Sequence, residues 1–383
     1  MFRYIFCFLF LPAYIVASPK QIAPGVVYEK LSQKGPLVIH TIKVDPKMVA
    51  LRPVHALDDG IGREILSSIA YRYGSIVALN GDFFQMRGAL AGSPRGTLKQ
   101  QDDWFSITQK PYPALGWNKD ASIVLCDKIT TTVHLTINGE EIPLDAFNRT
   151  AHPDKVTLFS PIFHRTTLSP PEQVEVIIQN GRVVAIDKKN GGNKIPEDGY
   201  VLSFGQKNPL ISRIQLKDKV KVNFFIEPML TLTQSVLEAQ KWAYCDFIIS
   251  GAPLLVKGGI TQNDFESDGL SQDILTLRRA RSVVGTLEDG SWLFLLVEAS
   301  PKSLGATMNE LAQIITQFHF KQALNFDGGA SSELIINGKI KNRIEQESDN
   351  TSKSKHEITN QPFVKERAIA DAILILPKGT SRL

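Results

Sequence analysis

The chain has 383 residues, of which 43% are hydrophobic and 21% charged, so it carries enough apolar side chains for a sizeable buried core. Its net charge of +4 is spread without a basic stripe interleaved with aromatic residues, which argues against nucleic-acid binding. The seven histidines form no His-x-His or His-Glu-x-x-His pattern, which argues against a zinc hydrolase.

The first 17 residues are typical of a secretory signal peptide. Arg3 precedes an apolar run that ends at Val16, and Pro19 favours cleavage after Ala17. The run is short for a helix that crosses a bilayer, and no later segment is apolar enough to do so. We therefore expect an exported protein of the periplasm, the cell envelope or the extracellular medium, without a membrane span after cleavage.

Two cysteines remain once the expected signal peptide is removed. Cys126 and Cys245 both stand among apolar residues. In an oxidising compartment they could form a disulfide, and two buried thiols are the alternative.

The segment from residue 18 to 117 mixes helix and strand patterns. Residues 62–73 predict a helix, and the apolar run after Gly74 predicts a strand that ends in Ala78-Leu-Asn-Gly-Asp82. Asn80 and Asp82 would then lie at the end of this strand.

Residues 118–230 differ in character, because short alternating apolar stretches follow one another there. Asn138-Gly139 and Asn180-Gly181 are strong signals for tight hairpin turns. We interpret residues 118–230 as a β-rich insertion or subdomain in a catalytic core made of residues 18–117 and 231–383.

A second helix and strand follow near the end of the chain. Between Thr307 and Phe318, apolar residues recur at the spacing of one helix face. Thr307 and Glu310 have capping-box spacing, which gives Glu310 a structural explanation beside a catalytic one. A short apolar run then ends in Ala323-Leu-Asn-Phe-Asp327.

The turn Asp327-Gly-Gly-Ala-Ser-Ser332 combines a carboxylate with glycines and hydroxyls at a strand end. The N–H groups of Gly328 and Gly329, with the hydroxyls of Ser331 and Ser332, are suited to binding an anion. A tight turn in which the glycines only supply positive φ is the alternative.

The two predicted strands end in the same pattern, Ala-Leu-Asn-x-Asp. If both lie in one sheet, Asn80, Asp82, Asn325 and Asp327 converge at one edge, where ligands often bind in α/β sheets. The side-chain amides of Asn80 and Asn325 could orient a bound ligand or water there.

The last part of the chain contains a polar loop and a strand. Residues 341–361 are rich in Ser, Asn, Lys and Glu and predict a flexible loop, whereas residues 367–376 predict a buried strand. Taken together, the patterns predict an α+β fold with a mixed sheet, few packed helices and a β-rich middle subdomain.

Several segments in this order resemble the phosphodiester glycosidase family. The resemblance covers about residues 36–376 and rests on Ala78-Leu-Asn-Gly-Asp-Phe-Phe84, Ser93-Pro-Arg-Gly96, Ser160-Pro161 with Thr166-Thr167, Gly251-Ala-Pro-Leu-Leu-Val256, Arg281-Ser-Val-Val-Gly285, Glu310-Leu-Ala312, Asn325-Phe-Asp-Gly-Gly-Ala-Ser-Ser332 and Glu366-Arg367.

This resemblance implies an exported hydrolase that cleaves a sugar from a sugar-1-phosphodiester, giving free sugar and a phosphomonoester. Its substrate would be a small molecule or glycan that carries a phosphodiester, such as a GlcNAc-1-phosphodiester. The acid–base candidates are Asp327 first, then Glu310 and Asp82. Arg281 and Arg367 are candidates for the phosphate oxygens, and a structural salt bridge is the alternative for each.

The sequence also departs from the family pattern. Glu298-Ala-Ser300 stands where Asp-Gly is usual, and Ala330 replaces the third glycine of Asp-Gly-Gly-Gly-Ser. Residues 341–361 form a longer insertion than the family pattern suggests. The cysteine-rich modules that follow the catalytic domain in the animal enzyme have no counterpart in this chain.

Two other functions remain open. Because the sequence departs from the family pattern at these positions, one alternative is a non-catalytic protein that binds envelope or exopolysaccharide glycans in the same pocket. A phosphodiesterase that attacks phosphorus is the second alternative, although such enzymes usually rely on metal-bound hydroxide or a covalent nucleophile. No cofactor or metal loop is evident, while the acidic cluster leaves a divalent cation as an alternative.

Overall fold

The computed structural model describes residues 14–16, 18–33, 36–229, 239–345 and 365–380. Most of the expected signal peptide and most of the expected loop 341–361 lie outside these residues. The described part is about 45% strand and 12% helix, so the fold is mostly β. This composition agrees with the expected α+β fold with few packed helices. All of its strand pairs are antiparallel except β13 with β14.

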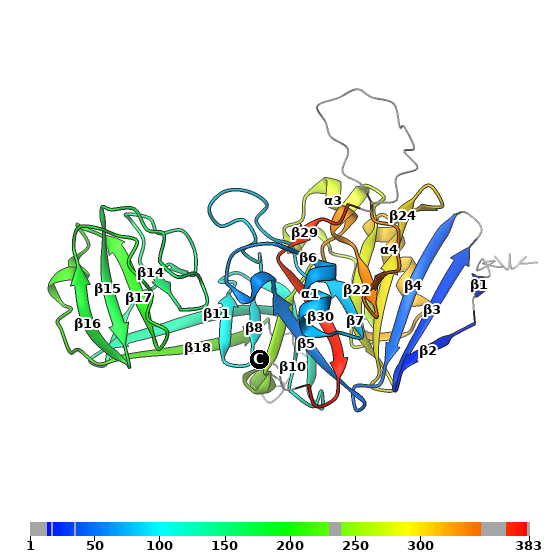
Figure 1. Ribbon diagram of the computed structural model, residues 1–383, viewed down its shortest axis with the longest axis horizontal. Coiled ribbons are helices and arrows are strands. Elements are labelled where there is room, and N and C mark those ends of the chain that lie inside the picture. The colour runs from blue at the N-terminus through cyan, green and yellow to red at the C-terminus, as the bar shows by residue number, and fades with distance from the viewer. Residues whose placement is uncertain (1–13, 17, 34–35, 230–238, 346–364, 381–383) are drawn as a thin grey trace, which may run out of the picture.

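Two sheets form the centre of the body (Figure 1). The larger sheet has the order β1 (Tyr14–Val16), β3 (Val26–Gln33), β4 (Leu37–Val44), β23 (Trp292–Val297), β22 (Arg281–Leu287), β26 (Phe320–Asn325), β20 (Leu254–Lys257) and β21 (Ile260–Thr261), with β2 (Lys20–Ala23) paired to β3. The smaller sheet has the order β28 (Lys339–Ile340), β27 (Leu334–Ile336), β7 (Val77–Asn80), β30 (Asp371–Pro377) and β5 (Val49–His55).

Helices cover the outer faces of these two sheets. They are α1 (Leu66–Tyr73), α3 (Gln272–Thr276) and α4 (Met308–Thr316). Two two-stranded pairs lie nearby, β6 (Glu64–Ile65) with β29 (Ala368–Ile369), and β24 (Ala299–Ser300) with β25 (Ser303–Leu304).

Alternating side chains explain why the sheets stack. On β26, Leu324 points into the core between the two sheets, whereas Ala323 packs on the side of α4. On β7, Leu79 enters the same central core, and Ala78 packs with the residues of α1. Each central strand is therefore buried on both faces, and the layers run helix, sheet, sheet, helix.

A third sheet extends from the body into a separate lobe. It contains β12 (Glu140–Ile142), β11 (Val124–Ile137), β10 (Tyr112–Trp117), β19 (Phe247–Ser250), β8 (Leu98–Gln100) and β9 (Asp103–Ser106), with β18 (Val220–Pro228) paired to β11. Figure 1 shows β11 and β18 running side by side from the body toward the lobe.

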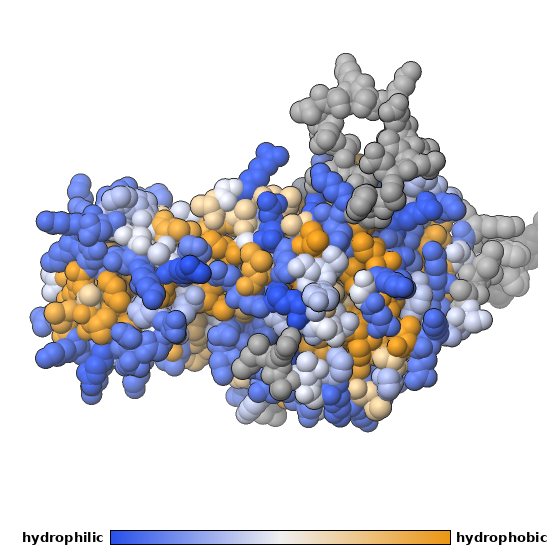
Figure 2. Space-filling model, in the orientation of Figure 1, coloured by the Kyte–Doolittle hydropathy of each residue, from blue (hydrophilic) through white to orange (hydrophobic). Residues whose placement is uncertain are grey.

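The lobe is a five-stranded sheet inside the segment that we expected to be β-rich. Its order is β13 (Ala146–Phe147), β14 (Thr157–Phe159), β17 (Gly199–Gly205), β15 (Gln173–Gln179) and β16 (Arg182–Asp187). Both expected hairpin turns are confirmed, because Asn138-Gly139 joins β11 to β12 and Asn180-Gly181 joins β15 to β16, each with two positive φ angles. Figure 2 shows apolar residues gathered over the lobe among hydrophilic ones.

The expected helix–strand units are present, but their strands do not share a sheet. α1 ends at Gly74 in the left-handed conformation and leads to β7, and α4 leads to β26. The convergence of their ends was predicted on the condition that β7 and β26 lie in one sheet, whereas they belong to the smaller and the larger sheet. Apolar periodicity marks both as buried strands, but it carries no signal for which partner each strand takes.

Cys126 and Cys245 are free and buried in this structure, which matches the alternative of two buried thiols and not the disulfide. Within the described residues, no helix combines the length and the apolar character needed to cross a bilayer.

Candidate active site

The ends of β7 and β26 meet although the two strands belong to different sheets. The Asp327 N–H donates to the Gly81 carbonyl at 2.9 Å, and the Asn80 side-chain amide donates to the Asp327 carbonyl at 2.8 Å. The expected convergence of the two Asn-x-Asp segments therefore occurs across the junction of two sheets.

Asn80 and Asn325 are fully buried and bond mainly to neighbouring protein groups. The Asn80 Oδ1 accepts a bond from the Ser282 hydroxyl at 2.7 Å, which links the two sheets. The Asn325 Nδ2 donates to the carbonyls of Ala252 at 2.6 Å and Phe326 at 2.7 Å. These contacts give both amides a role in shaping the backbone beneath the acidic residues.

Asp82 is a buried carboxylate held by main-chain donors. It accepts bonds from the N–H of Phe83 at 2.7 Å and from that of Gly96 at 2.8 Å. Burial raises the pKa of Asp82 to about 7, and the negative charge of Asp327 adds to the increase while the two N–H bonds oppose it. Asp82 can therefore exchange a proton near neutral pH.

Asp371, the first residue of β30, is a site neighbour that the sequence patterns did not single out. Its Oδ1 accepts the Asp82 N–H at 2.7 Å, and a Cβ on Gly81 would lie 1.9 Å from this atom, so the close approach requires glycine. Burial first, and the charge of Asp82 second, raise the pKa of Asp371 well above its usual range. The sequence did contain one signal for Asp371, because a carboxylate within an otherwise apolar strand is unusual.

Asp327 lies half-buried at the start of the glycine turn. Its Oδ1 accepts the Gly328 N–H at 2.9 Å. Burial raises the pKa of Asp327, whereas a hydrogen bond from Ser331 and the charge of Arg367 lower it. Arg367 also donates to the Ser331 hydroxyl at 3.1 Å, so Ser331 links the guanidinium to the carboxylate.

The glycine turn differs from the expected anion site. The Gly328 N–H is bonded to Asp327, and the Gly329 N–H donates to the Ala280 carbonyl at 2.9 Å. Both donors are therefore engaged within the protein, and the expectation that they bind an anion is not supported. Gly329 has φ +62°, which fits the tight-turn alternative, and Ser332 is buried with its hydroxyl 3.1 Å from that of Ser282.

Arg281 is buried and bonds to main-chain carbonyls. Its Nε donates to Ala306 at 2.9 Å, and its Nη2 donates to Ile274 at 2.7 Å and to Leu277 at 2.9 Å. Burial lowers the pKa of Arg281 to about 10, and the charge of Arg279 adds to the decrease. These contacts fix the segments around α3, so the expected phosphate role gains no support from them.

Two more accessible arginines lie beside the glycine turn, because a Cβ on Gly329 would lie 3.6 Å from the Arg279 Nη1 and Arg367 bonds to Ser331. Arg279 also pairs with Glu345 at 3.6 Å. Arg279 and Arg367 are half-buried, and Arg63 is exposed. Burial lowers the pKa of Arg367, the charges of Arg279 and Arg63 lower it further, and Asp327 raises it. The sequence analysis named Arg281 and not its neighbour Arg279, because the run Arg278-Arg-Ala-Arg281 carries no signal for which guanidinium stays at the surface.

Glu310 takes the structural role that its spacing allowed. Its carboxylate accepts the Thr307 N–H at 2.9 Å while its own N–H bonds to the Thr307 hydroxyl at 3.2 Å, which completes a capping box. The same carboxylate pairs with Arg278.

The altered segment after β23 is also explained by packing. Glu298 is buried, with its Oε1 2.8 Å from the His40 Nε2 and 3.2 Å from the Arg343 N–H. The His40 Nδ1 lies 2.9 Å from the Tyr28 hydroxyl. Glu298 therefore belongs to a buried polar network that joins β3, β4 and β23.

The lobe also supports the site through Arg149. This guanidinium donates to the Pro94 carbonyl at 2.9 Å and bonds to the Ser93 hydroxyl. It thereby holds the loop that carries Gly96 and its bond to Asp82, and the negative charge of Asp82 acts on it.

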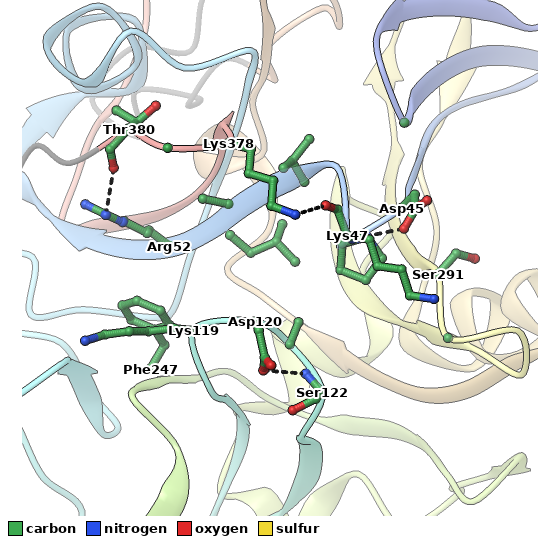
Figure 3. A pocket seen from close by; sticks show the side chains of 18 of the residues that line it. Asp45, Lys47, Arg52, Lys119, Asp120, Ser122, Phe247, Ser291, Lys378 and Thr380 are labelled. Carbon is green, nitrogen blue, oxygen red and sulfur yellow. Dashed lines mark hydrogen bonds between the residues drawn. The ribbon is translucent and has the colours of Figure 1, made fainter.

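A hollow of about 1100 Å³ lies at the opposite end of the sandwich (Figure 3). It is lined by the start of β5 and by the residues after β30, whereas Asp371 stands at the other end of β30. Many of its polar groups already have partners, since Lys378 donates to the Lys47 carbonyl at 2.6 Å and Arg52 to the Thr380 carbonyl at 3.0 Å. The acidic strand ends are the better candidate, because they combine paired carboxylates with nearby cations.

A model of the phosphodiester glycosidase family matches residues 172–376, more than half of the chain. The chain belongs to this family. The resemblance seen in the sequence is thereby confirmed, and the family match covers β26, the glycine turn and β30.

The relatives of this chain include proteins that are described as uncharacterized or hypothetical. An uncharacterized protein of Rickettsia conorii is 25% identical over 235 residues, which cover 60% of this chain and 77% of the relative. A hypothetical protein from Synechocystis has a TM-score of 0.77 at 20% identity, covering 96% of this chain and 64% of its own. A candidate exported protein from Burkholderia pseudomallei has a TM-score of 0.66 at 17% identity, covering 89% and 74%. These two likenesses show the fold alone.

A second carboxyl pair lies next to the site. Glu333 is buried and hydrogen-bonded to Glu366, which accepts bonds from the Ser67 N–H at 3.0 Å and its hydroxyl at 2.6 Å. Burial, and then Glu366, raise the pKa of Glu333 to about 9. The folded protein therefore holds a proton that the unfolded chain releases near pH 4.5, so this pair favours folding at low pH and loses that effect as pH rises toward 9.

We predict that Glu333→Gln flattens this dependence. An amide can donate to Glu366 at every pH, so the variant should match wild type at pH 5 and be more stable at pH 9 by about 1–3 kcal/mol. Urea unfolding across this range measures the difference, with the exposed Glu172→Gln as control. Parallel pH curves for Glu333→Gln and wild type would contradict the proton-sharing pair.

Proposed function

We propose that this protein hydrolyses a glycosyl phosphodiester, such as a GlcNAc-1-phosphodiester, to free sugar and a phosphomonoester. The observation that carries the proposal is the meeting of two raised-pKa carboxylates, Asp82 and Asp327, beside a group of arginines. Membership of the phosphodiester glycosidase family supports the same reaction and a glycan substrate.

The phosphodiester anion would bind on the arginine side of Asp327. Arg279 and Arg367 are half-buried there, where partial removal from water strengthens a charged hydrogen bond to phosphate. The sugar would then extend toward Asp82. This arrangement replaces the buried Arg281 with Arg279 as the phosphate-binding candidate.

The two carboxylates would divide the chemistry between them. Asp82 takes a proton from water as the water oxygen forms its bond to the anomeric carbon. The bond from that carbon to the phosphate oxygen breaks, and the electron pair leaves with the phosphomonoester, which needs little protonation. Asp327 stabilises the positive charge that builds up on the sugar ring.

We also propose that the protein is exported. The pattern of residues 1–17 supports export, as does the similarity to a candidate exported protein of Burkholderia pseudomallei.

The first prediction concerns the acidic residues. Asp327→Asn and Asp82→Asn should each reduce kcat with a GlcNAc-1-phosphodiester by at least about 100-fold, because each removes a carboxylate that acts in the transition state. Glu310→Gln should keep kcat within about threefold of wild type, because its contacts belong to the start of α4. Released sugar is quantified for all four proteins.

Free sugar from wild type but not from the two aspartate variants is the expected result. Sugar phosphate plus alcohol as products would overturn the proposal in favour of attack at phosphorus. Wild-type glycan binding with no turnover would favour the non-catalytic alternative.

A second prediction concerns the phosphate side. Arg279→Ala should lower kcat/KM by about 10- to 100-fold, because a charged hydrogen bond to the diester contributes about 1.5–3 kcal/mol. Arg278→Ala is the matched control, since this neighbouring side chain is turned to Glu310. Equal effects of the two substitutions would argue against a phosphate site at Arg279.

A third prediction concerns pH. If Asp82 acts as the base, only its ionised form is active, so kcat/KM should rise as pH increases through about 7 and then level off. Steady-state rates between pH 5 and 9 measure this profile. A rate that instead falls through pH 7 would assign the acid role to Asp82.

A further inference from the structure

Tyr112 stands next to the loop that holds Asp82. It is the first residue of β10 and is 6% exposed. Its Cδ1 would lie 2.8 Å from a Cβ on Gly96, the residue whose N–H binds the Asp82 carboxylate. The Arg95 guanidinium lies over the ring, 5.5 Å from its centroid. The ring is thus fixed against the Asp82 loop.

The hydroxyl of Tyr112 is buried and finds no hydrogen-bond partner among the described residues. Leaving such a group unpaired costs about 1–3 kcal/mol, so buried hydroxyls normally bind protein or an ordered water. Burial first, and the charge of Asp82 second, raise the pKa of this phenol well above its usual range, and the charges of Asp268 and Asp327 add to the increase. The hydroxyl is therefore neutral, and its ring stands against the loop whose Gly96 N–H binds the Asp82 carboxylate.

Two further orphan atoms belong to residues of the same site. The Asn325 Oδ1 and the Asp371 Oδ2 are buried without a partner among the described residues. Asp371 adjoins Asp82 through the bond to the Asp82 N–H, and Asn325 lies two residues before Asp327. A polar interior with several orphan atoms is the setting in which proteins bind internal water.

We propose that Tyr112 is a positioning residue that holds the attacking water against Asp82. This inference rests on the proposed hydrolysis. The water gives one hydrogen to the Asp82 carboxylate and keeps the other, which is hydrogen-bonded to the Tyr112 Oη. Its free electron pair then forms the bond to the anomeric carbon, while the bond from that carbon to the phosphate oxygen breaks.

The kinetic test compares Tyr112→Phe with Tyr200→Phe, a half-buried tyrosine of the lobe. Tyr112→Phe should lower kcat about 10- to 100-fold with KM changed by less than about threefold, because the water and not the substrate loses a contact. Its thermal stability should stay close to that of wild type, because phenylalanine keeps the buried ring and removes only the hydroxyl and its water contact. Tyr200→Phe should leave kcat and KM unchanged.

Two kinetic outcomes would overturn the inference. An unchanged kcat in Tyr112→Phe would leave the hydroxyl with no part in the reaction. A raised KM at constant kcat would mean that the hydroxyl contacts the sugar instead of the water.

A second measurement does not depend on turnover. A crystal structure of the wild-type protein should show an ordered water bonded to both the Tyr112 Oη and the Asp82 carboxylate, and Tyr112→Phe should lose it. Density that shows no water there overturns the inference. If the water is present but wild type releases no sugar, the proposed hydrolysis fails while the water site stands.

Discussion

The hydrogen bond from the Asp327 N–H to the Gly81 carbonyl is the contact on which the site depends. It joins the ends of two strands that belong to different sheets. The Gly81 N–H in turn donates to the Asp371 carbonyl at 2.9 Å, so three acidic residues are tied together through one glycine backbone. Because Gly81 has no side chain, these three segments can approach closely, whereas a Cβ at position 81 would collide with the Asp371 carboxylate.

This junction places like charges in a buried space, and the protein stabilises them unequally. The Asp82 carboxylate accepts two main-chain N–H bonds. The Asp327 carboxylate accepts a hydrogen bond from Ser331 and lies near the charge of Arg367. Asp371 is buried, and one of its oxygens has no partner among the described residues. Unequal surroundings separate the proton affinities of neighbouring carboxyl groups, which is how one site can hold groups in different protonation states. The buried core around Leu324 and Leu79 keeps the geometry fixed.

The sequence predicted local features well and their assembly only in part. Helical spacing and the Thr307–Glu310 capping box predicted α4, and the two Asn-Gly pairs predicted hairpins, because these signals lie within a few neighbouring residues. The assignment of β7 and β26 to different sheets depends on distant pairing, which an apolar run does not encode.

The candidate site shows the same division. The motifs pointed to Asp82 and Asp327, which the structure brings together, but not to Asp371, Tyr112 or Arg149. Each of these three stands alone in the sequence and belongs to no motif. Their contacts with the site come from the fold and could not be predicted from local sequence. Arg281 is buried and Arg279 is only half-buried, although the two are separated by one residue. The burial of Arg281 follows from the packing of α3 against α4, since its guanidinium bonds to the Ile274 carbonyl in α3.

The two long strands β11 and β18 tie the lobe to the body by a continuous ladder from Ile129 paired with Pro228 to Ile137 paired with Val220. Such a ladder keeps the two strands in a fixed register, because each is hydrogen-bonded to the other along this length. Arg149, which follows β13 in the lobe, then connects the lobe to the loop that carries Gly96. A molecule that pushes or grips the lobe would therefore act mechanically on the acidic centre, even though the lobe itself contributes no carboxylate to it.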